Sequence, residues 1–305
     1  MRIPILTDEP EKQGGWHGNQ LKQAFALRGV EVVFVSLQDC VIDLASGLFG
    51  EKPSIKIPHF DTLPRAAFVR SIAGGTLQQI TTRLNVLHIL KMLGVRVYND
   101  GRAIERTVDK AMTSFLLHQA GIATPATWVC ESRLQAENIR QVAAQNNQRL
   151  VLKPLFGSQG LGVRKLPANA PLPVPMQQFV DGVYYFQQLI ETTPSAHDYR
   201  VFVIDGKVVA SMRRTGSSWV NNIAAGGICE GIQASEIMEK LALQAALALD
   251  IDYCGVDIIQ AGTEAENDGE YYVLEVNSIP AWKGLQSVTE VNIAQLLADD
   301  LLGKI

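Results

Sequence analysis

The stretch VLKPLFGSQGLGV at residues 151–163 combines a lysine among apolar neighbours with a loop that is poor in side chains. Lys153 ends the apolar run, and glycines stand at positions 157, 160 and 162. The pattern matches neither GxxxxGK(S/T) nor GxGxxG, because the strand-like GVRKL follows it where both fingerprints need the start of a helix. We therefore predict a flap between two strands, whose amides approach phosphate oxygens while Lys153 offers a point charge to the same anion. The alternative is an ordinary flexible hairpin with an exposed lysine.

Three oxygen-bearing side chains form a second candidate site. Asp257 lies in GVDII, and Glu275 and Asn277 lie in VLEVNSIP. Side chains alternate along a strand, so residues 275 and 277 share a face, and strand pairing brings Asp257 alongside them. Two carboxylates and an amide, without His or Cys, suit Mg²⁺, which takes oxygen ligands and completes its shell with water and phosphate. The alternative is a solvated face with unrelated acids, but the flanking valines and isoleucines argue against it, because a buried charge needs a partner.

A third candidate is Lys110, in ERTVDKAMT. We expect a helix at about 108–120 with Thr107 as its N-cap and Gly121 just past its end. A cation in the first turn opposes the helix macrodipole. A ligand role for Lys110 therefore competes with that of an exposed lysine.

Composition excludes several classes of function. The chain has 305 residues, 27 Lys and Arg against 31 Asp and Glu, and 47% hydrophobic residues. No basic block could follow a phosphate backbone, so we expect no nucleic-acid partner. The start of the chain does not resemble a signal peptide, and no window holds ~18 uninterrupted apolar residues, so we expect no membrane partner and a cytoplasmic location. The cysteines are scattered, which predicts neither a zinc site nor disulfides.

The chain divides into regions of different pattern. The first hundred residues alternate between strand-like and helix-like segments, which is typical of a doubly wound α/β domain. From residue 149, Gly and Asp-Gly turns between β-branched segments indicate antiparallel strands. We predict an α/β and α+β fold with a doubly wound domain at 1–100, a small central domain with the flap at 101–186, and an antiparallel-sheet domain with the metal site at 187–305. Strands are expected at 2–8, 30–37, 66–72, 95–99, 149–155, 162–166, 184–191, 198–206, 207–214, 253–260 and 271–277, and further helices at 19–28, 77–93 and 235–249.

Seven motifs occur in an order that resembles the ATP-grasp ligases of the RimK type. They are DK (109–110), LVLKPLFGSQGLGV (150–163), QQLIE (187–191), DYR (198–200), NNIAAGG (221–227), GVDII (255–259) and LEVNSIP (274–280). WKGLQ (282–286) and VNIA (291–294) then follow as in the glutamate ligases that extend tetrahydromethanopterin-like cofactors. The resemblance implies an ATP-grasp fold that covers residues from about 100 to 290.

The resemblance also implies a nucleotide site. Lys110 and Lys153 would hold the α- and β-phosphates, the flap the β- and γ-phosphates, and Glu191 or Asp198 the ribose hydroxyls. The backbone amides of residues 188–190 would meet the adenine edge. The residues assigned to ATP in this way are Lys110, Lys153, Gly157, Ser158, Gln159, Gly160, Gly162, Gln188, Leu189, Ile190, Glu191, Asp198 and Asn222.

In such enzymes a substrate carboxylate attacks the γ-phosphate, and an amine captures the resulting acyl phosphate as an amide. Negative charge builds on phosphoryl oxygens and on a tetrahedral oxyanion. Metals and cations are expected to stabilise this charge, and no protein nucleophile is needed. The resemblance places one or two Mg²⁺ ions, with Mn²⁺ as an alternative, at Asp257, Glu275 and Asn277. Arg200 and Arg214 are the candidate catalytic cations. The sequence departs from the family at Ala225, where the RGG version has an arginine.

The substrate is expected to contact the first domain. GGWHGNQL (14–21) puts glycines and Asn19 before an expected helix, which is an anion-binding arrangement, and Gly74 and Gly75 repeat it beside Arg70. Each arrangement alone is more often a turn. Lys283, in WKGLQ, is a further substrate candidate. His17 fits a packing or surface role better than that of a base.

An extra carboxylate on the substrate is expected to be bound by an arginine among Arg70, Arg200 and Arg214. All three lie in apolar strand contexts, where an unpaired guanidinium is costly and a carboxylate is a bidentate partner. The alternative is that these arginines pair with acids of the protein, such as Asp198, or with nucleotide phosphates.

The function predicted is an ATP-dependent carboxylate–amine ligase that joins an amino acid to a carboxylate acceptor. The expected reaction adds L-glutamate to a tetrahydromethanopterin-like or methanofuran-like cofactor or its precursor, and a homo-oligomer is expected. Alternatives are a ligase for another amino acid or for a peptide or protein C-terminus, a small-molecule kinase, and a nucleotide-binding protein without turnover. The fold alone does not decide among them.

Overall fold

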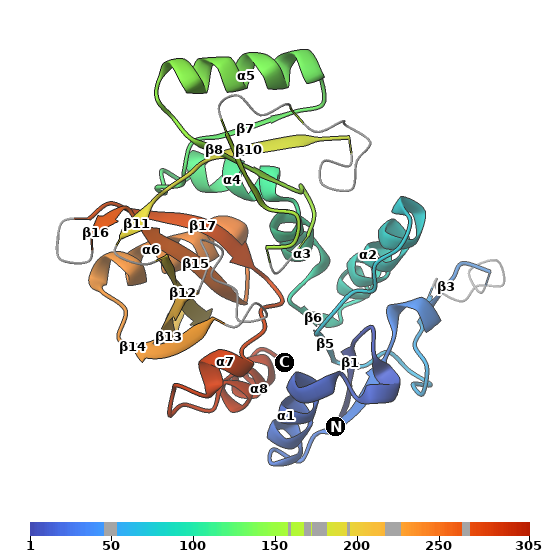
Figure 1. Ribbon diagram of the computed structural model, residues 1–305. Helices are drawn as coiled ribbons and strands as arrows, with labels where there is room; N and C mark the ends of the chain where they lie inside the picture. The colour runs from blue at the N-terminus through green and yellow to red at the C-terminus, as the bar shows by residue number, and fades with distance from the viewer. Residues whose placement is uncertain are drawn as a thin grey trace.

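The structure is a computed structural model (Figure 1), and it describes residues 1–45, 54–157, 160–167, 172, 182–193, 196–216, 227–263 and 269–305. A parallel sheet in the first part of the chain is followed by antiparallel sheets, which confirms the predicted α/β and α+β class. The boundaries of the three predicted domains and the predicted homo-oligomer stay predictions. Within the described ranges, no helix combines the length and the apolar character needed to cross a membrane.

The first sheet has four parallel strands in the order β2-β1-β5-β6. Its strands and connecting helices are β1 (Arg2–Leu6), α1 (Gly15–Ala26), β2 (Glu31–Val35), β5 (Ala66–Val69), α2 (Leu77–Met92) and β6 (Arg96–Tyr98). This order confirms the predicted doubly wound unit, since parallel strands need crossover connections. The sequence analysis missed the short hairpin of β3 (Val41–Asp43) and β4 (Ser54–Lys56), as well as the 3-10 helices η1 (Pro10–Lys12) and η2 (Leu37–Asp39).

The predicted single helix at 108–120 is wrong at its start. The chain forms two helices, α3 (Gly101–Val108) and α4 (Lys110–Gln119), and Asp109 caps the second by accepting from the backbone N–H groups of Ala111 and Met112. Thr107, expected as the N-cap, lies inside α3, and its hydroxyl bonds instead to Ser278 Oγ at 2.6 Å. Both Thr and Asp are favourable caps, so the local sequence did not distinguish them. Gly121 has a φ of 71°, as expected just past a helix end.

The second sheet is antiparallel, with its strands in the order β7-β10-β8-β9. Its elements are β7 (Thr127–Cys130), α5 (Arg133–Gln145), β8 (Leu150–Lys153), β9 (Arg164–Leu166) and β10 (Tyr184–Gln188). α5 covers one face of this sheet, as Figure 1 shows. The glycine loop joins β8 directly to its antiparallel neighbour β9, which confirms the predicted flap between two strands.

The third sheet has five antiparallel strands in the order β14-β13-β12-β15-β17. Its elements are β12 (His197–Ile204), β13 (Lys207–Thr215), β14 (Ile228–Ile232), α6 (Glu236–Leu249), β15 (Tyr253–Gln260) and β17 (Tyr271–Asn277), and the short pair β11 (Thr192–Thr193) and β16 (Gly262–Thr263) lies beside it. α6 packs on this sheet through Ala242, Ala245 and Leu249. The predicted ranges for β12, β13, α6, β15 and β17 agree with these elements to within a few residues, whereas no strand was predicted at β11, β14 or β16.

The end of the chain returns to the first sheet. α7 (Lys283–Gln286) and α8 (Ile293–Gly303) follow β17, and α8 lies beside α1 (Figure 1). One apolar cluster joins Phe68 and Tyr98 of the first sheet to Phe202 of the third sheet, to Trp282, and to leucines of α8 such as Leu297. The first and third sheets therefore share a core, which fixes the loops between them.

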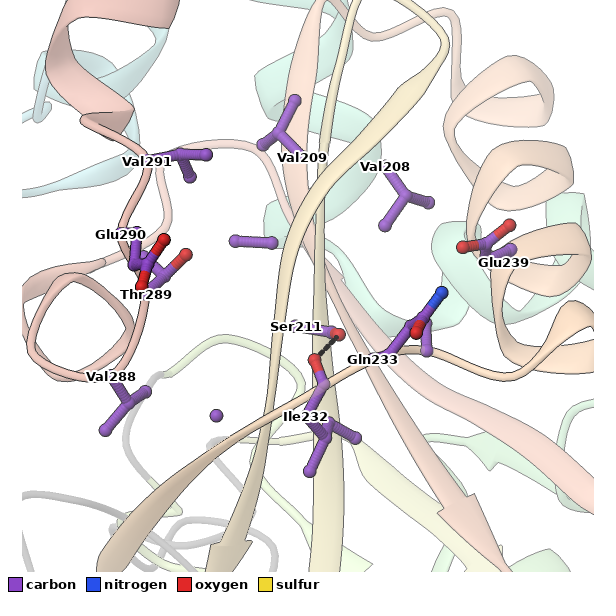
Figure 2. Close-up of a pocket in the computed structure, with 13 residues that line it drawn as sticks. Val208, Val209, Ser211, Ile232, Gln233, Glu239, Val288, Thr289, Glu290 and Val291 are labelled. Atoms are coloured by element: carbon purple, nitrogen blue, oxygen red, sulfur yellow. Dashed lines mark hydrogen bonds between the residues drawn. The ribbon is translucent and has the colours of Figure 1, made fainter.

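A groove of about 690 Å³ lies on the third sheet, between β13, the end of β14 and segment 288–291. Glu239 and Glu290 stand on opposite sides of it (Figure 2). None of the side chains predicted to do chemistry lines this groove. The candidate site is therefore built from the side chains themselves.

Candidate active site

Lys153 and Lys110 approach the glycine loop from two different elements. Lys153 is the last residue of β8, and its Nζ donates to Gln187 Oε1 on the neighbouring strand β10. Lys110 opens α4, and its Nζ donates to the carbonyl oxygen of Gly157 at 2.8 Å and to that of Leu155 at 3.4 Å. Lys110 thus ties α4 to the start of the flap, while Lys153 lies at its base.

Three glycines of the flap need backbone freedom. Gly157, Gly160 and Gly162 have φ values of 143°, 66° and 76°. A residue with a Cβ atom rarely adopts these angles, so the backbone conformation itself requires glycine at these three positions. Ser158 and Gln159 of the flap lie outside the described residues, as do Asn222 and Ala225.

The two lysines share an electrostatic site with the predicted metal ligands. Burial lowers the pKa of Lys153 to about 8, with attraction by Glu275 and Asp257 opposing the shift and repulsion by Lys110 adding to it. Burial also lowers the pKa of Lys110, against attraction by Glu275 and Asp109. Lys153 is only partly accessible, so the expectation of an exposed lysine is wrong, whereas the role of the loop in anion binding stays a prediction.

Asp257 and Glu275 face each other across the antiparallel strands β15 and β17, and Asn277 pairs with Gly255. This register confirms that the three oxygen-bearing side chains come from adjacent positions. Glu275 forms no ion pair with a cation of the described residues, and Asn277 Nδ2 is buried without a hydrogen-bond partner among them. Asn277 Nδ2 can only donate, so it calls for an oxygen acceptor such as water or phosphate, while the Asn277 amide oxygen and the two carboxylates are ligands that fit Mg²⁺.

Two arginines converge on Asp257. Arg200 makes a bidentate pair with it, Nε to Oδ1 and Nη2 to Oδ2, both at 2.7 Å. Arg214 Nη2 lies 2.9 Å from Asp257 Oδ2, and its Nε donates to Asp198 Oδ1 at 2.5 Å. The register explains this, since Arg200 pairs with Asp257 across β12 and β15, and Asp198 pairs with Arg214 across β12 and β13. The alternative that both arginines pair with acids of the protein is therefore confirmed.

The network keeps Asp257 ionised. Burial acts to raise the pKa of Asp257, but the guanidinium groups of Arg200 and Arg214 overcome it and hold that pKa below its ordinary value. Burial raises the pKa of Asp198 above its ordinary value. Each carboxylate oxygen has two lone pairs, so Asp257 keeps acceptor capacity beyond the arginines.

The segment after β10, expected to meet an adenine, uses two of its amides internally. The N–H of Gln188 donates to Ala126 O at 2.8 Å, and that of Leu189 donates to Arg149 O at 2.7 Å. The N–H of Ile190 donates to no backbone carbonyl within the described ranges. Glu191 forms an ion pair with Arg149. Of the three backbone amides predicted to contact adenine, only the N–H of Ile190 makes no backbone hydrogen bond within the described ranges and stays a candidate donor.

Arg70 directly follows β5 and forms no ion pair with an acid of the described residues. Its guanidinium carbon lies 5.1 Å from the centre of the Trp282 ring, and Nη1 reaches Ile279 O only at 3.5 Å. His17 accepts a hydrogen bond at Nε2 from the backbone N–H of Trp282 at 3.1 Å, which confirms its predicted packing role. Lys283 begins α7 next to Trp282 and is exposed.

Of the two glycine-containing segments predicted to bind an anion, one has its predicted place before a helix and the other does not. Asn19 does not precede a helix: α1 begins at Gly15, and Asn19 Nδ2 donates to Gly15 O at 3.0 Å within it. The prediction placed the helix start too late because Gly14, at a φ of 63°, rather than Asn19, ends the turn. Gly74 and Gly75 do precede α2, which Thr76 caps.

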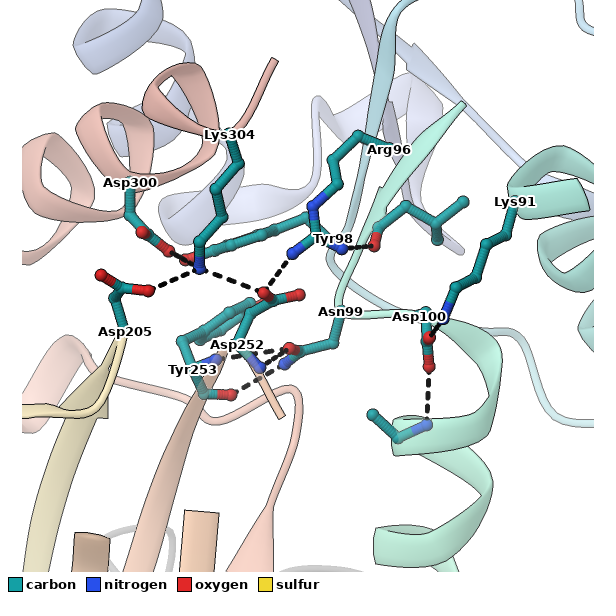
Figure 3. Close-up of polar contacts among 12 residues, drawn as sticks. Lys91, Arg96, Tyr98, Asn99, Asp100, Asp205, Asp252, Tyr253, Asp300 and Lys304 are labelled. Atoms are coloured by element: carbon teal, nitrogen blue, oxygen red, sulfur yellow. Dashed lines mark hydrogen bonds and ion pairs between the residues drawn. The ribbon is translucent and has the colours of Figure 1, made fainter. Parts of the chain in front are cut away.

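Asn99 is a residue that the sequence analysis missed. It is fully buried between β6 and α3, and Nδ2 donates to the carbonyl oxygens of Tyr253 and Ser278, both at 2.7 Å. Its Oδ1 accepts from the N–H of Asp252 at 2.8 Å (Figure 3). Asn99 thus holds the start of β15 against the residue that follows Asn277. An asparagine after an apolar strand looks like an ordinary turn residue, so no local signal marks it.

Ion pairs surround Asn99 and hold α8 in place. Lys304 lies 3.0 Å from Asp205, 3.1 Å from Asp252 and 2.9 Å from Asp300 (Figure 3). Arg96 of β6 also pairs with Asp252. These contacts reinforce the shared core of the first and third sheets.

The model of the RimK-like ATP-grasp domain matches residues 107–301, which is more than half of the chain. The chain belongs to the RimK-like ATP-grasp family. The match includes both lysines, the flap, the arginine pairs and the residues on β15 and β17. Homologues in this family are named ligases, and the protein is a ligase that forms C–N bonds.

Two relatives share the name tetrahydromethanopterin:alpha-L-glutamate ligase. The protein from Methanococcus maripaludis is 30% identical over 307 residues, which cover 99% of this chain and 98% of that protein. The protein from Methanocaldococcus jannaschii is 37% identical over 224 residues, which cover 70% of this chain and 73% of that protein.

Solved structures confirm the ATP-grasp fold. The ATP-grasp ligase PsnB, complexed with a minimal precursor, has a TM-score of 0.73 at 22% identity, and the match covers 99% of this chain and 98% of that one. A RimK domain ATP-grasp protein from Sphaerobacter thermophilus has a TM-score of 0.69 at 21% identity, covering 99% and 100%.

Proposed function

We propose that the protein is an ATP-dependent carboxylate–amine ligase that adds L-glutamate to a tetrahydromethanopterin-like cofactor or its precursor. The names of the two relatives above support the substrate class. The observation that carries the proposal is the arrangement of charges: Asp257 lies opposite Glu275, and both act electrostatically on Lys153. A site with this composition can hold a nucleotide triphosphate and a divalent cation.

The nucleotide binds between the second and third sheets. Lys110 and Lys153 contact its phosphates, the flap covers them, and the amide of Ile190 meets the adenine. Asp257, Glu275 and Asn277 hold one or two Mg²⁺ ions, which supply neutralisation of phosphate charge. A PsnB structure complexed with Mg and ADP, at a TM-score of 0.71, supports this arrangement by its fold.

The proposed reaction has two steps, and neither needs a protein nucleophile. An oxygen of the acceptor carboxylate attacks the γ-phosphorus, and ADP leaves. The amino nitrogen of glutamate then attacks the acyl carbon, inorganic phosphate leaves, and the amine gives up a proton. Arg200 and Arg214 act by holding Asp257 ionised and in place, because both form ion pairs with it and Arg214 also pairs with Asp198.

The test is to incubate the protein with ATP, Mg²⁺, L-glutamate and tetrahydromethanopterin and to measure ADP release and the mass of the product. The expected product is heavier by one or more glutamyl residues, with one ADP released for each. Methanofuran-type and peptide carboxylates serve as the other acceptors. A product that contains phosphate would make the protein a kinase, and ADP release without any requirement for an amino acid would contradict the ligase assignment.

A further inference from the structure

Arg70 is the only one of the three candidate substrate-binding arginines that the described residues leave without an acid. Arg200 and Arg214 are both satisfied by aspartates. Arg70 forms no ion pair with a described residue, its one hydrogen bond to Ile279 O is at the 3.5 Å limit, and its Nε is buried without a partner. A guanidinium has five N–H donors, so most of this group's donors have no acceptor among the described residues.

The surroundings of Arg70 favour an anion. Asp8 attracts Arg70 electrostatically but forms no ion pair with it, and the Asp8 carboxylate accepts a hydrogen bond from the Ser71 hydroxyl. Burial lowers the pKa of Arg70. Burial, together with repulsion by Arg70 and Lys283, lowers the pKa of His17 to about 3. Arg70 and Lys283 therefore both act on a neutral histidine, and neither forms an ion pair with an acid of the described residues.

The Trp282 ring packs against the Arg70 guanidinium. This ring is fully buried and makes an edge contact with His17, at 4.6 Å between ring centres. The backbone N–H of Trp282 holds the histidine by the bond to Nε2. A planar guanidinium on an indole face is held in one orientation, which leaves its edge for a bidentate acceptor.

The same place adjoins the proposed reaction centre. Segment 278–282 starts directly after Asn277 and ends in Trp282. Arg70 contacts it at Ile279 O, and Arg200 contacts it at Ala281 O, 3.4 Å from Nη1. A group bound at Arg70 therefore lies beside the segment that directly follows β17, the strand that carries Glu275 and Asn277.

We propose that Arg70, which lies on the Trp282 ring and beside Lys283, binds the side-chain carboxylate of the amino-acid substrate. This carboxylate takes no part in the reaction. The proposal rests on the proposed function and deepens it: Arg70 is the residue that distinguishes L-glutamate from its amide, L-glutamine. The guanidinium and the carboxylate form two parallel N–H···O bonds, and no covalent step is involved.

The test compares L-glutamate with L-glutamine in Arg70→Gln, Arg70→Lys and the wild type, with tetrahydromethanopterin, ATP and Mg²⁺. The wild type is expected to prefer glutamate by at least ~10²-fold in kcat/KM, because a site built for a charged group rejects its neutral analogue. Arg70→Gln is expected to reduce this preference at least ~10-fold while the KM for ATP stays within about threefold, and Arg70→Lys to fall in between. Arg28→Gln is the matched control: Arg28 also belongs to the first sheet's layer but pairs with Asp299, so its preference should equal that of the wild type.

An equilibrium-binding arm separates this inference from the proposed function. L-glutamate and glutarate are titrated into the protein with ADP and Mg²⁺, which needs no acceptor. If no glutamylated product forms but L-glutamate binds and Arg70→Gln weakens binding, the proposed function fails and the subsite stands. If the wild type binds neither probe, or if Arg70→Gln and Arg70→Lys, with melting temperatures like that of the wild type, keep its glutamate preference, the role of Arg70 is overturned. An equal loss for both amino acids would assign Arg70 a purely structural role.

Discussion

Lys153 should make nucleotide affinity depend on pH in a range where lysines ordinarily do not titrate. Burial lowers its pKa to about 8, whereas an ordinary lysine stays charged well above pH 9. Phosphate favours the charged form, so binding above this pKa requires uptake of a proton. The sign is therefore fixed: affinity is full below pH 8 and is lost as the pH rises through it.

The size of the effect follows from the pKa. About nine-tenths of Lys153 is charged at pH 7 and about one-tenth at pH 9, by the definition of a pKa near 8. If only the charged form binds, the Kd for ADP with Mg²⁺ increases about tenfold between these values, which is about 1.4 kcal/mol. Lys110 adds to the slope in the same direction, since burial lowers its pKa as well.

Calorimetric titration of ADP with Mg²⁺ from pH 6.5 to 9.5 would measure this. Lys153→Arg is the matched control, because a guanidinium keeps its charge over the whole range and its Kd should vary less than about threefold. A wild-type Kd that does not change between pH 7 and 9 would show that Lys153 does not contact phosphate. A slope in Lys153→Arg equal to that of the wild type would assign the titration to another group.

Three further changes have defined outcomes. Glu275→Gln should lower kcat at least ~10²-fold with an unchanged melting temperature, because it removes charge at the phosphate and metal position; near-normal turnover at saturating Mg²⁺ would remove Glu275 from the metal site. Asn99→Asp keeps the shape of a fully buried side chain but replaces the Nδ2 donor with an acceptor oxygen, which then faces two carbonyl oxygens. It should lower the free energy of unfolding by about 3 kcal/mol or more in urea titrations, and a loss under 1 kcal/mol would contradict the clamp. Gly231→Ala places a Cβ atom 2.2 Å from Val288 O and should cost about 1–3 kcal/mol, whereas Gly303→Ala meets nothing within 4 Å and should be neutral in the same titration.

The sequence predicted those features that depend on local periodicity. Alternation with a period of two places Glu275 and Asn277 on one face, and their strand pairs with that of Asp257 as expected. The glycines at 157–162 occur between strands because positive φ angles favour glycine there. The order of strands and helices up to residue 100 predicted the parallel sheet, since only crossover connections join parallel neighbours.

Other features depended on contacts between distant parts of the chain. The sequence left open whether Arg70, Arg200 and Arg214 meet protein acids or a ligand, because an ion pair depends on which strands become neighbours. β12 lies between β13 and β15, and this order brings Asp198 and Asp257 to Arg214 and Arg200. Arg70 ends a strand of a different sheet, where it meets the face of Trp282 and no acid of the described residues.

The amino-acid sequence by itself therefore determined which residue types face one another along each strand and which loops need glycine, because these follow from backbone geometry. Only the tertiary structure decided which charges are neutralised. Asn99 shows the reason most directly, because its four hydrogen bonds join it to residues 252, 253 and 278, each at least 153 positions away in the chain. Such a contact depends on the shared core of the first and third sheets, and no local pattern specifies it.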